Sequence, residues 1–210
     1  MKNSPYLIFD FDGTLIDSFR AAMEKLNLLA DEFNFRKISS DEVDGLRDLT
    51  SRELIKYLEI PIYKIPSVLR CARKHMRSEM QALLPFTNLP EILQELHDMK
   101  IPLGILTSNS SENVTRWLER NKMEHLFNFI HIESSYFGKK RILRKILKTY
   151  KIDKSQTFYI GDETRDVEAA KECGVYSVTV TWGFNSEKIL TQHQPHYIVR
   201  KPEDILTICK

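Results

Sequence analysis

The sequence predicts an α/β fold with a mostly parallel sheet, and three observations support this prediction. From residue 84 onward, short apolar runs of strand length alternate with amphipathic helical patterns, which is typical of parallel strands with helices on both faces. One more apolar run, Tyr6–Phe9, stands alone near the N-terminus, and residues 17–83 show helical patterns only. At 210 residues the chain can hold one domain with a modest insertion. We therefore expect an α/β core of residues 1–16 and 84–210, with a helical insertion at 17–83.

Several runs of apolar and β-favouring residues have the length of strands rather than helices. The first run leaves no room for a helix and ends in polar residues, so we expect a buried strand there. The last run is short, and we expect it at an edge of the sheet. The predicted strands are residues 6–9, 101–106, 127–132, 157–160, 175–180 and 197–199.

Helical signals fill the insertion. Apolar residues recur at three- and four-residue spacing from Ala22 to Phe33, with charged residues between them. Residues 40–42 look like a helix start, and Thr50–Glu53 forms a full capping-box pattern whose helix Pro61 must end. A further helix is expected over residues 66–83.

The predicted core helices also carry start and stop signals. Pro90 stands where a first helical residue would be, and Ser110 or Ser111 can cap the following helix. A helix over residues 139–150 has a basic face and an apolar face, which we interpret as solvated and packed, respectively. Gly174 is expected to close the helix before the fifth strand.

Composition narrows the functional classes. The net charge of +2 argues against nucleic acid as the main ligand. The cysteines Cys71, Cys173 and Cys209 are far apart, so we expect reduced thiols. No signal-peptide pattern is present, and no apolar run approaches the roughly 20 residues that span a bilayer. We expect a soluble, cytoplasmic protein with no membrane partner.

Two carboxylates and a glycine follow the first strand. Asp10 and Asp12 are two residues apart, so an extended backbone would direct both side chains the same way. Two negative charges at such a short separation are unfavourable unless a cation or a proton neutralises one of them. Gly13 can adopt the left-handed backbone conformation of a turn that leads the chain out of the sheet. Two solvated aspartates at a strand end would give the same pattern. An EF-hand calcium loop is disfavoured, because Thr14 and Ala21 occupy ligand positions.

Polar residues follow two further strands and should meet Asp10 and Asp12 at one edge of the sheet. Thr107, Ser108 and Asn109 follow the predicted strand at 101–106, and Asp162 and Asp166 follow the predicted strand at 157–160. Either Lys139 or Lys140 opens the helix that lies between these two groups of residues. Clustered carboxylates beside a lysine, a hydroxyl and backbone amides suit a divalent cation next to an anion. Mg²⁺ and a phosphate group match this set best.

Four segments, FDFDGTLIDS, LTSN, FGKK and GDETRD, resemble the four motifs of the haloacid dehalogenase superfamily, in the same order. The insertion after the first motif resembles the α-helical cap of that superfamily. The resemblance covers nearly the whole chain and is strongest to the phosphoglycolate-phosphatase-like members, including TWGF after the fifth strand. It implies a Rossmann-like α/β core and a Mg²⁺-dependent phosphatase acting on a small-molecule phosphomonoester.

The resemblance also implies roles for individual residues. Asp10 would be the nucleophile that forms an aspartyl-phosphate, and Asp12 the general acid and base. Asp10, Asp162 and the backbone carbonyl of Asp12 would hold Mg²⁺. Thr107 would hold the phosphoryl oxygens together with the amides near Ser108 and Asn109.

The remaining implied roles concern charge and orientation. Lys139 would neutralise developing charge, with Lys140 as the competing choice. Asp166 and Glu163 would form an outer shell that orients the metal site. The helical insertion would select the substrate, and within it Arg47 and Arg52 are the hypothesised substrate contacts.

Alternatives remain open at this level. A sugar phosphomutase would use the same core residues, and a non-catalytic binding protein could keep the fold and dock a partner through its basic helix. A phosphonate hydrolase would need a cap lysine such as Lys25, Lys37 or Lys56. A dehalogenase is disfavoured, because a halide leaves without a proton and the dehalogenases of the superfamily lack an acid at the position of Asp12. Either a monomer or a homodimer is compatible with the sequence.

Overall fold

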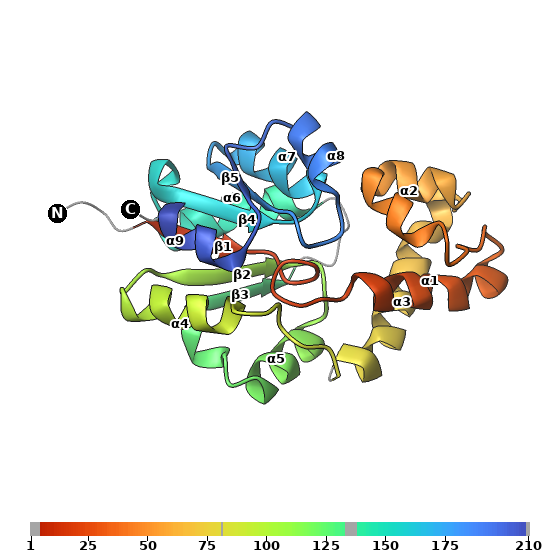
Figure 1. The fold of residues 1–210 in the computed structure, drawn as a ribbon, viewed down its shortest axis with the longest axis horizontal. Coiled ribbons are helices and arrows are strands. Elements are labelled where there is room, and N and C mark those ends of the chain that lie inside the picture. Colours follow the sequence, from red (N-terminus) through yellow and green to blue (C-terminus); the bar gives the residue numbers. More distant parts are fainter. Residues whose placement is uncertain (1–4, 81, 133–137, 209–210) are drawn as a thin grey trace.

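The computed structural model describes residues 5–80, 82–132 and 138–208. Its centre is a parallel sheet of six strands in the order β3-β2-β1-β4-β5-β6 (Figure 1). The strands are β1 (Tyr6–Phe9), β2 (Leu103–Thr107), β3 (Phe129–Ile132), β4 (Thr157–Gly161), β5 (Tyr176–Val180) and β6 (Tyr197–Val199). The predicted α/β class is therefore confirmed, and the last strand lies at an edge as expected.

Strand β1 lies at the middle of the sheet, because it pairs with β2 on one side and β4 on the other. Its alternating side chains serve two apolar layers. Leu7 and Phe9 belong to the layer that includes α4 (Leu89–Asp98), α5 (Ser111–Arg120) and α9 (Ile205–Ile208), and Ile8 belongs to the layer that includes α6 (Lys139–Thr149) and α7 (Thr164–Cys173). Burial on both faces fixes the register of β1 and therefore the position at which Asp10 leaves the sheet.

The segment between β1 and α4 contains helices only among its described residues, as predicted. They are α1 (Phe19–Phe33), η1 (Val43–Asp48), α2 (Ser51–Tyr57), η2 (Ile62–Lys64) and α3 (Ile65–Met80), and α1, α2 and α3 lie together at one end of the molecule (Figure 1). The helices α1, α2 and α3 share an apolar cluster, while Met76 and Met80 of α3 pack into one of the two layers of the sheet. We propose that residues 17–83 form a cap domain on a core of residues 1–16 and 84–210.

The two crossings between the core and the cap lie side by side. Ile16 and Pro85 form an isolated antiparallel bridge, and the Asp17 amide donates to the Leu84 carbonyl oxygen at 3.4 Å. This pairing supports the proposed domain limits.

Of the two helix starts predicted in the cap, one is confirmed and the other leads only to a short 3₁₀ helix. The Thr50 capping box is present, since the Thr50 hydroxyl accepts from the Glu53 amide and the Glu53 carboxylate accepts from the Thr50 amide. The expected helix start at residues 40–42 leads only to the short 3₁₀ helix η1. The Glu42 carboxylate does not cap it, because it accepts hydrogen bonds from the Ser39 amide and the Tyr57 hydroxyl and pairs with Arg36.

A few element bounds differ from the prediction. Strand β2 begins after Pro102, which has no amide hydrogen to donate to a neighbouring strand. Helix α8 (Glu187–Gln192) was not predicted, although Ser186 caps it, and neither was α9. Cys71 and Cys173 are free thiols as expected, whereas Cys209 lies outside the described residues. None of the helices that the structure describes combines the length and the apolar character needed to cross a bilayer.

Candidate active site

The carboxyl ends of β2, β1 and β4 meet at one edge of the sheet, since these three strands are parallel neighbours. Thr107 is the last residue of β2, Asp10 directly follows β1, and Asp162 directly follows β4. The structure thus brings together the three strand ends that the sequence analysis grouped.

A buried ionic cluster occupies this edge. Carboxylate oxygens of Asp10, Asp162 and Asp166 lie within 4.8 Å of one another, and all three residues are buried. The Lys139 ammonium donates to Asp166 Oδ1 at 2.6 Å and forms an ion pair with Asp10 Oδ2. Asp166 is fixed further by the Glu163 amide at 3.1 Å and the Tyr159 hydroxyl at 3.2 Å.

Asp162 is held from two other directions. The Thr14 hydroxyl donates to its Oδ1 at 2.6 Å, and the Phe184 amide donates to its Oδ2 at 2.7 Å. The chain also packs tightly here, because a Cβ atom on Gly13 would lie 2.1 Å from Asp162 Oδ2, and Gly13 has a φ of +74°. Only glycine fits this combination of space and backbone conformation.

The electrostatics of the cluster indicate a missing positive charge. Burial raises the pKa of Asp10 to about 7, and it raises the pKa of Asp162 well above its usual range, with nearby carboxylates adding to both effects. Burial disfavours the Lys139 ammonium, yet Asp10 and Asp166 outweigh this and raise its pKa. Three buried carboxylates therefore face one ammonium, and a divalent cation would balance them. Oxygen ligands of this kind fit Mg²⁺.

Asp12 does not belong to this cluster. Its carboxylate accepts hydrogen bonds from Asn109 Nδ2 at 2.9 and 3.1 Å and from the Ser18 hydroxyl at 3.2 Å. Burial raises the pKa of Asp12, and the hydrogen bonds from Asn109 and Ser18 oppose this. The sequence predicted parallel carboxylates; the structure gives Asp10 and Asp12 different partners, which suits different chemical roles.

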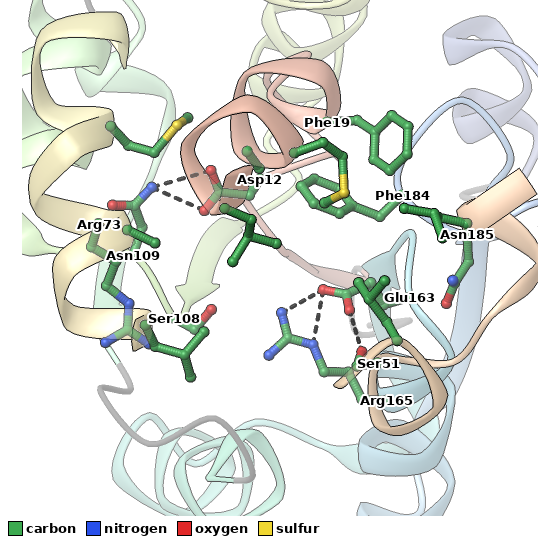
Figure 2. Close-up of a pocket in the computed structure, with 18 of the residues that line it drawn as sticks. Asp12, Phe19, Ser51, Arg73, Ser108, Asn109, Glu163, Arg165, Phe184 and Asn185 are labelled. Carbon is green, nitrogen blue, oxygen red and sulfur yellow. Dashed lines mark hydrogen bonds and ion pairs between the residues drawn. The ribbon is translucent and has the colours of Figure 1, made fainter. Parts of the chain in front are cut away.

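The turn after β2 presents polar groups beside Asp12. The Thr107 hydroxyl accepts from the Asn109 amide at 3.0 Å, and Asn109 Oδ1 accepts from the Ser110 amide and from Asn113 Nδ2. Ser110 caps α5, as predicted, by accepting from the Asn113 amide. These bonds hold Asn109 so that its amide group meets Asp12, and Ser108 lies nearby (Figure 2).

The two lysines of the third motif separate on α6. Lys139 is buried in the ionic cluster, whereas Lys140 is half-buried and pairs with Glu172. Adjacent helical residues point about 100° apart, so both cannot face one site. The structure favours Lys139 and gives Lys140 no place as a substrate contact.

A cavity of about 180 Å³ lies between the cap and the core, with Asp12 in its wall (Figure 2). Its lining includes Ser108 and Asn109, and two arginines from opposite sides, Arg73 of α3 and Arg165 of α7. Burial lowers the pKa of Arg73, the neighbouring Arg165 lowers it further, and Asp12 acts the other way. This electrostatic pattern places two cations near one acidic group.

Glu163 lines this cavity beside the ionic cluster. Its carboxylate accepts from Arg165 Nε at 2.9 Å and from the Ser51 hydroxyl of the cap at 2.6 Å (Figure 2). Arg165 favours the ionised carboxylate, so the pKa of Glu163 is lowered even though burial opposes this. Glu163 therefore links the cap to Arg165, and its charge also raises the pKa values of Asp162 and Lys139.

The two cap arginines predicted to contact substrate do not line the cavity. Arg47 donates to the Thr181 carbonyl oxygen at 3.2 Å, and its guanidinium carbon lies 5.6 Å from the centre of the Phe19 ring. Arg52 is exposed on α2. The arginines that line the cavity are Arg73 and Arg165, and these two are the better candidates for substrate contacts.

Both missed arginines left signals in the sequence. Arg165 lies inside the GDETRD motif. Arg73 shares one helix face with the apolar residues Leu69, Ala72 and Met76, and a charged residue on an apolar helix face is unusual. The contribution of residues 182–186 was also missed, apart from the resemblance of TWGF. Asn185 Nδ2 donates to the Leu49 carbonyl oxygen at 2.8 Å, and the Phe184 ring meets Phe19 edge-on at 5.3 Å.

Comparisons with known proteins agree with this geometry. A family model described as "Haloacid dehalogenase-like hydrolase" matches residues 7–180. The chain belongs to this family. A phosphoglycolate phosphatase of Synechococcus elongatus is 32% identical over 200 residues, which cover 95% of this chain and 94% of that protein. The pyrophosphatase PpaX of Bacillus mycoides is 22% identical, covering 96% of this chain and 95% of that protein.

The fold also matches that of solved structures. The crystal structure of a predicted phosphatase from Clostridium acetobutylicum superposes with a TM-score of 0.83 at 21% sequence identity, over 98% of this chain and 97% of that one. A haloacid dehalogenase-like hydrolase, SP0104 from Streptococcus pneumoniae, gives a TM-score of 0.81 at 22% identity over 100% of both chains. The resemblance of the four motifs is therefore confirmed at the level of the family and the fold.

Proposed function

We propose that the protein is a Mg²⁺-dependent phosphatase that hydrolyses a small-molecule phosphomonoester through an aspartyl-phosphate on Asp10. The observation that carries this proposal is the ion pair of Asp10 with Lys139 inside a buried acidic cluster, with Asp12 in the adjoining cavity wall. Relatives named phosphoglycolate phosphatase make phosphoglycolate a natural first substrate to assay.

In the first step an oxygen of Asp10 attacks phosphorus, and the bond between phosphorus and the leaving oxygen breaks. Asp12 donates its proton to that oxygen, which leaves as an alcohol. Burial raises the pKa of Asp12, which favours the proton-carrying form that a general acid needs. Asn109 and Ser18 hold its oxygens in position.

In the second step Asp12 accepts a proton from water as the water oxygen attacks phosphorus. The bond between phosphorus and Asp10 breaks, phosphate leaves, and the Asp10 carboxylate is restored. Both steps use the same two aspartates, and their different partners support the division between nucleophile and acid.

Mg²⁺, held by Asp10, Asp162 and the Asp12 carbonyl with Asp166 behind them, would offset the negative charge of the phosphoryl group and the carboxylates. Lys139 adds a fixed positive charge beside Asp10, and the Thr107 and Ser108 region offers hydrogen-bond donors at the strand end. Arg73 and Arg165 face the cavity and would attract a phosphate dianion toward Asp12.

Two measurements test the proposal. Hydrolysis of p-nitrophenyl phosphate and of phosphoglycolate should require Mg²⁺ and stop in EDTA, and Ca²⁺ should support poor turnover because it takes more ligands in a looser geometry. Acid quenching during turnover, borohydride reduction and peptide mass spectrometry should then find Asp10 converted to homoserine. Full rates in EDTA, or reduction at a different aspartate, would overturn the metal or the nucleophile assignment.

The same assays separate the alternatives. A phosphomutase would convert a sugar phosphate into its isomer without releasing phosphate. A non-catalytic binding protein would release no phosphate from any ester. Inorganic pyrophosphate belongs in the substrate panel, because some relatives are named pyrophosphatase.

A further inference from the structure

The cavity beside Asp12 has two chemically different walls. Its charged and polar groups are concentrated on the core side, in Asp12, Ser108, Asn109, Glu163, Arg165 and Asn185. Eleven of its nineteen lining residues are apolar, and ten of these eleven belong to the cap segment 17–83. In Figure 2 the Phe19 and Phe184 rings lie on one side of Asp12, and Arg73 and Ser108 lie on the other.

The apolar wall includes four well-buried side chains that border open space. Phe19, Met23, Leu46 and Met76 are each less than 9% exposed, yet all four border the cavity. A void of this kind destabilises a folded protein unless something fills it. An apolar cavity of roughly 150 Å³ in another protein stays dry and binds benzene, and the present cavity is about 180 Å³.

The position of Asp12 determines which part of a substrate enters the cavity. Asp12 lines the cavity, whereas Asp10, Lys139, Asp162 and Asp166 do not. An acid in the wall must reach the leaving oxygen, so the carbon atoms attached to that oxygen lie on the cavity side. Among the described cap residues in the lining only Ser51 and Arg73 are polar, and the Ser51 hydroxyl already donates to Glu163. Hydroxyl groups buried against the rest of the cap wall would stay unpaired, which is unfavourable.

We propose that the preferred substrate is a phosphomonoester whose leaving alcohol has a compact apolar body, of the size of a short alkyl chain or a phenyl ring, and that the apolar wall of the cap selects it. This inference rests on the proposed phosphatase function and names the substrate class for the same site. Ala22 of α1 and Ala72 of α3 both line the apolar wall, so the size of these two residues sets the space available.

A homologous series of substrates tests the inference in the wild-type protein. Methyl, ethyl, propyl, butyl and pentyl phosphate have leaving groups of similar basicity, so differences in kcat/KM report binding of the chain. We expect kcat/KM to rise by up to about fourfold per added methylene group and to level off when the cavity is full. Benzyl phosphate should exceed phosphoglycolate and glycerol 3-phosphate.

Variants then locate the effect. Ala72→Leu and Ala22→Leu would fill the cavity from two helices, and each should reduce the ratio of kcat/KM for pentyl over methyl phosphate toward one. Ser78→Leu adds the same side chain at an exposed position of α3 that does not line the cavity, and should keep the wild-type ratio. Circular dichroism checks that each variant folds.

The outcomes separate the inference from the proposed function. Measurable turnover with a flat alkyl series, or a preference for phosphoglycolate or glycerol 3-phosphate over every alkyl and benzyl ester, would overturn the apolar assignment and leave the phosphatase in place. A wild-type ratio in both alanine variants would overturn the role of the cap wall. Absence of phosphate release from every ester would overturn the proposed function itself.

Discussion

The core wall and the cap wall of the cavity are stabilised in opposite ways. On the core side, polar side chains are held by mutual hydrogen bonds, such as those from Asn109 to Asp12 and from Arg165 to Glu163. On the cap side, apolar side chains surround open space. A hydrogen-bonded wall fixes geometry within narrow limits, whereas an apolar wall tolerates changes of size and shape. The comparison indicates that the core determines the reaction and the cap determines what is accepted.

The largest effect is expected at the nucleophile. Asp10→Asn replaces a carboxylate with an amide that cannot attack phosphorus, so turnover should fall to background for every ester in the panel. Circular dichroism should show a native fold, because the amide occupies nearly the same volume. Activity close to wild type in this variant would show that the buried ionic cluster of the core does not supply the nucleophile.

A second test uses the two adjacent lysines. Lys139→Met leaves Asp10 and Asp166 buried without their cation, and we expect a destabilisation of about 3–5 kcal/mol in EDTA, with most turnover lost. Urea unfolding followed by tryptophan fluorescence measures it, and added Mg²⁺ should restore part of the stability.

Lys140→Met provides the matched control. It removes only a solvent-accessible ion pair with Glu172, so the free energy of unfolding should stay within about 0.5 kcal/mol of wild type. Equal destabilisation by the two substitutions would contradict the separation of the lysines seen on α6.

A smaller loss is expected at the acid. Asp12→Asn should lower kcat for alkyl phosphates by about 10²–10⁴, because the leaving oxygen then receives no proton. The loss should be smaller for p-nitrophenyl phosphate, whose phenolate leaves without a proton. If both substrates lose activity equally, Asp12 acts in the second step or through structure alone.

Arg73 on α3 of the cap tests whether a charged residue of the cavity contacts the phosphate group. Arg73→Ala should lower kcat/KM by about tenfold for all phosphomonoesters, since one charge-assisted contact to the phosphate is removed. Arg70→Ala, an exposed arginine one turn earlier on α3, should leave steady-state kinetics unchanged. A loss confined to substrates with a second acid group would assign Arg73 to the leaving group instead.

The smallest effect concerns stability of the cap and not chemistry. The hydrogen bonds from Tyr57 and Ser39, together with Arg36, lower the pKa of Glu42 to about 2. A lowered folded-state pKa means that the ionised group stabilises the fold above its ordinary pKa of 4.5, and that this stabilisation disappears as the pH falls toward 2.

Glu42→Gln should therefore lower the melting temperature at pH 7, and the difference from wild type should shrink once the pH falls below about 4.5. Glu24→Gln, at an exposed position of α1, is the control and should show a smaller difference at pH 7. A difference for Glu42→Gln that does not change with pH would show that its carboxylate is not the stabilising group.

The sequence predicted the fold and the core wall well, because both depend on local patterns. Apolar runs located all six strands, and the polar groups after three of them converge because parallel strands end at one edge. The cap wall could not be predicted in the same way. Arg73 reaches the cavity only through the packing of α3 against α1, and Arg47 turns toward Thr181 because of a loop from the far end of the chain.

The exit and return of the chain at Ile16 and Pro85 has a consequence for how such a protein can diversify. Since the two ends of the inserted segment are bonded to each other, its length and sequence can change without altering the register of any strand. Residues 182–186 limit this freedom, because Asn185 and Ser186 bind carbonyl groups of the cap while the Phe184 amide binds Asp162. A transplanted cap would thus bring a new selectivity to the same reaction only if this short loop were exchanged with it.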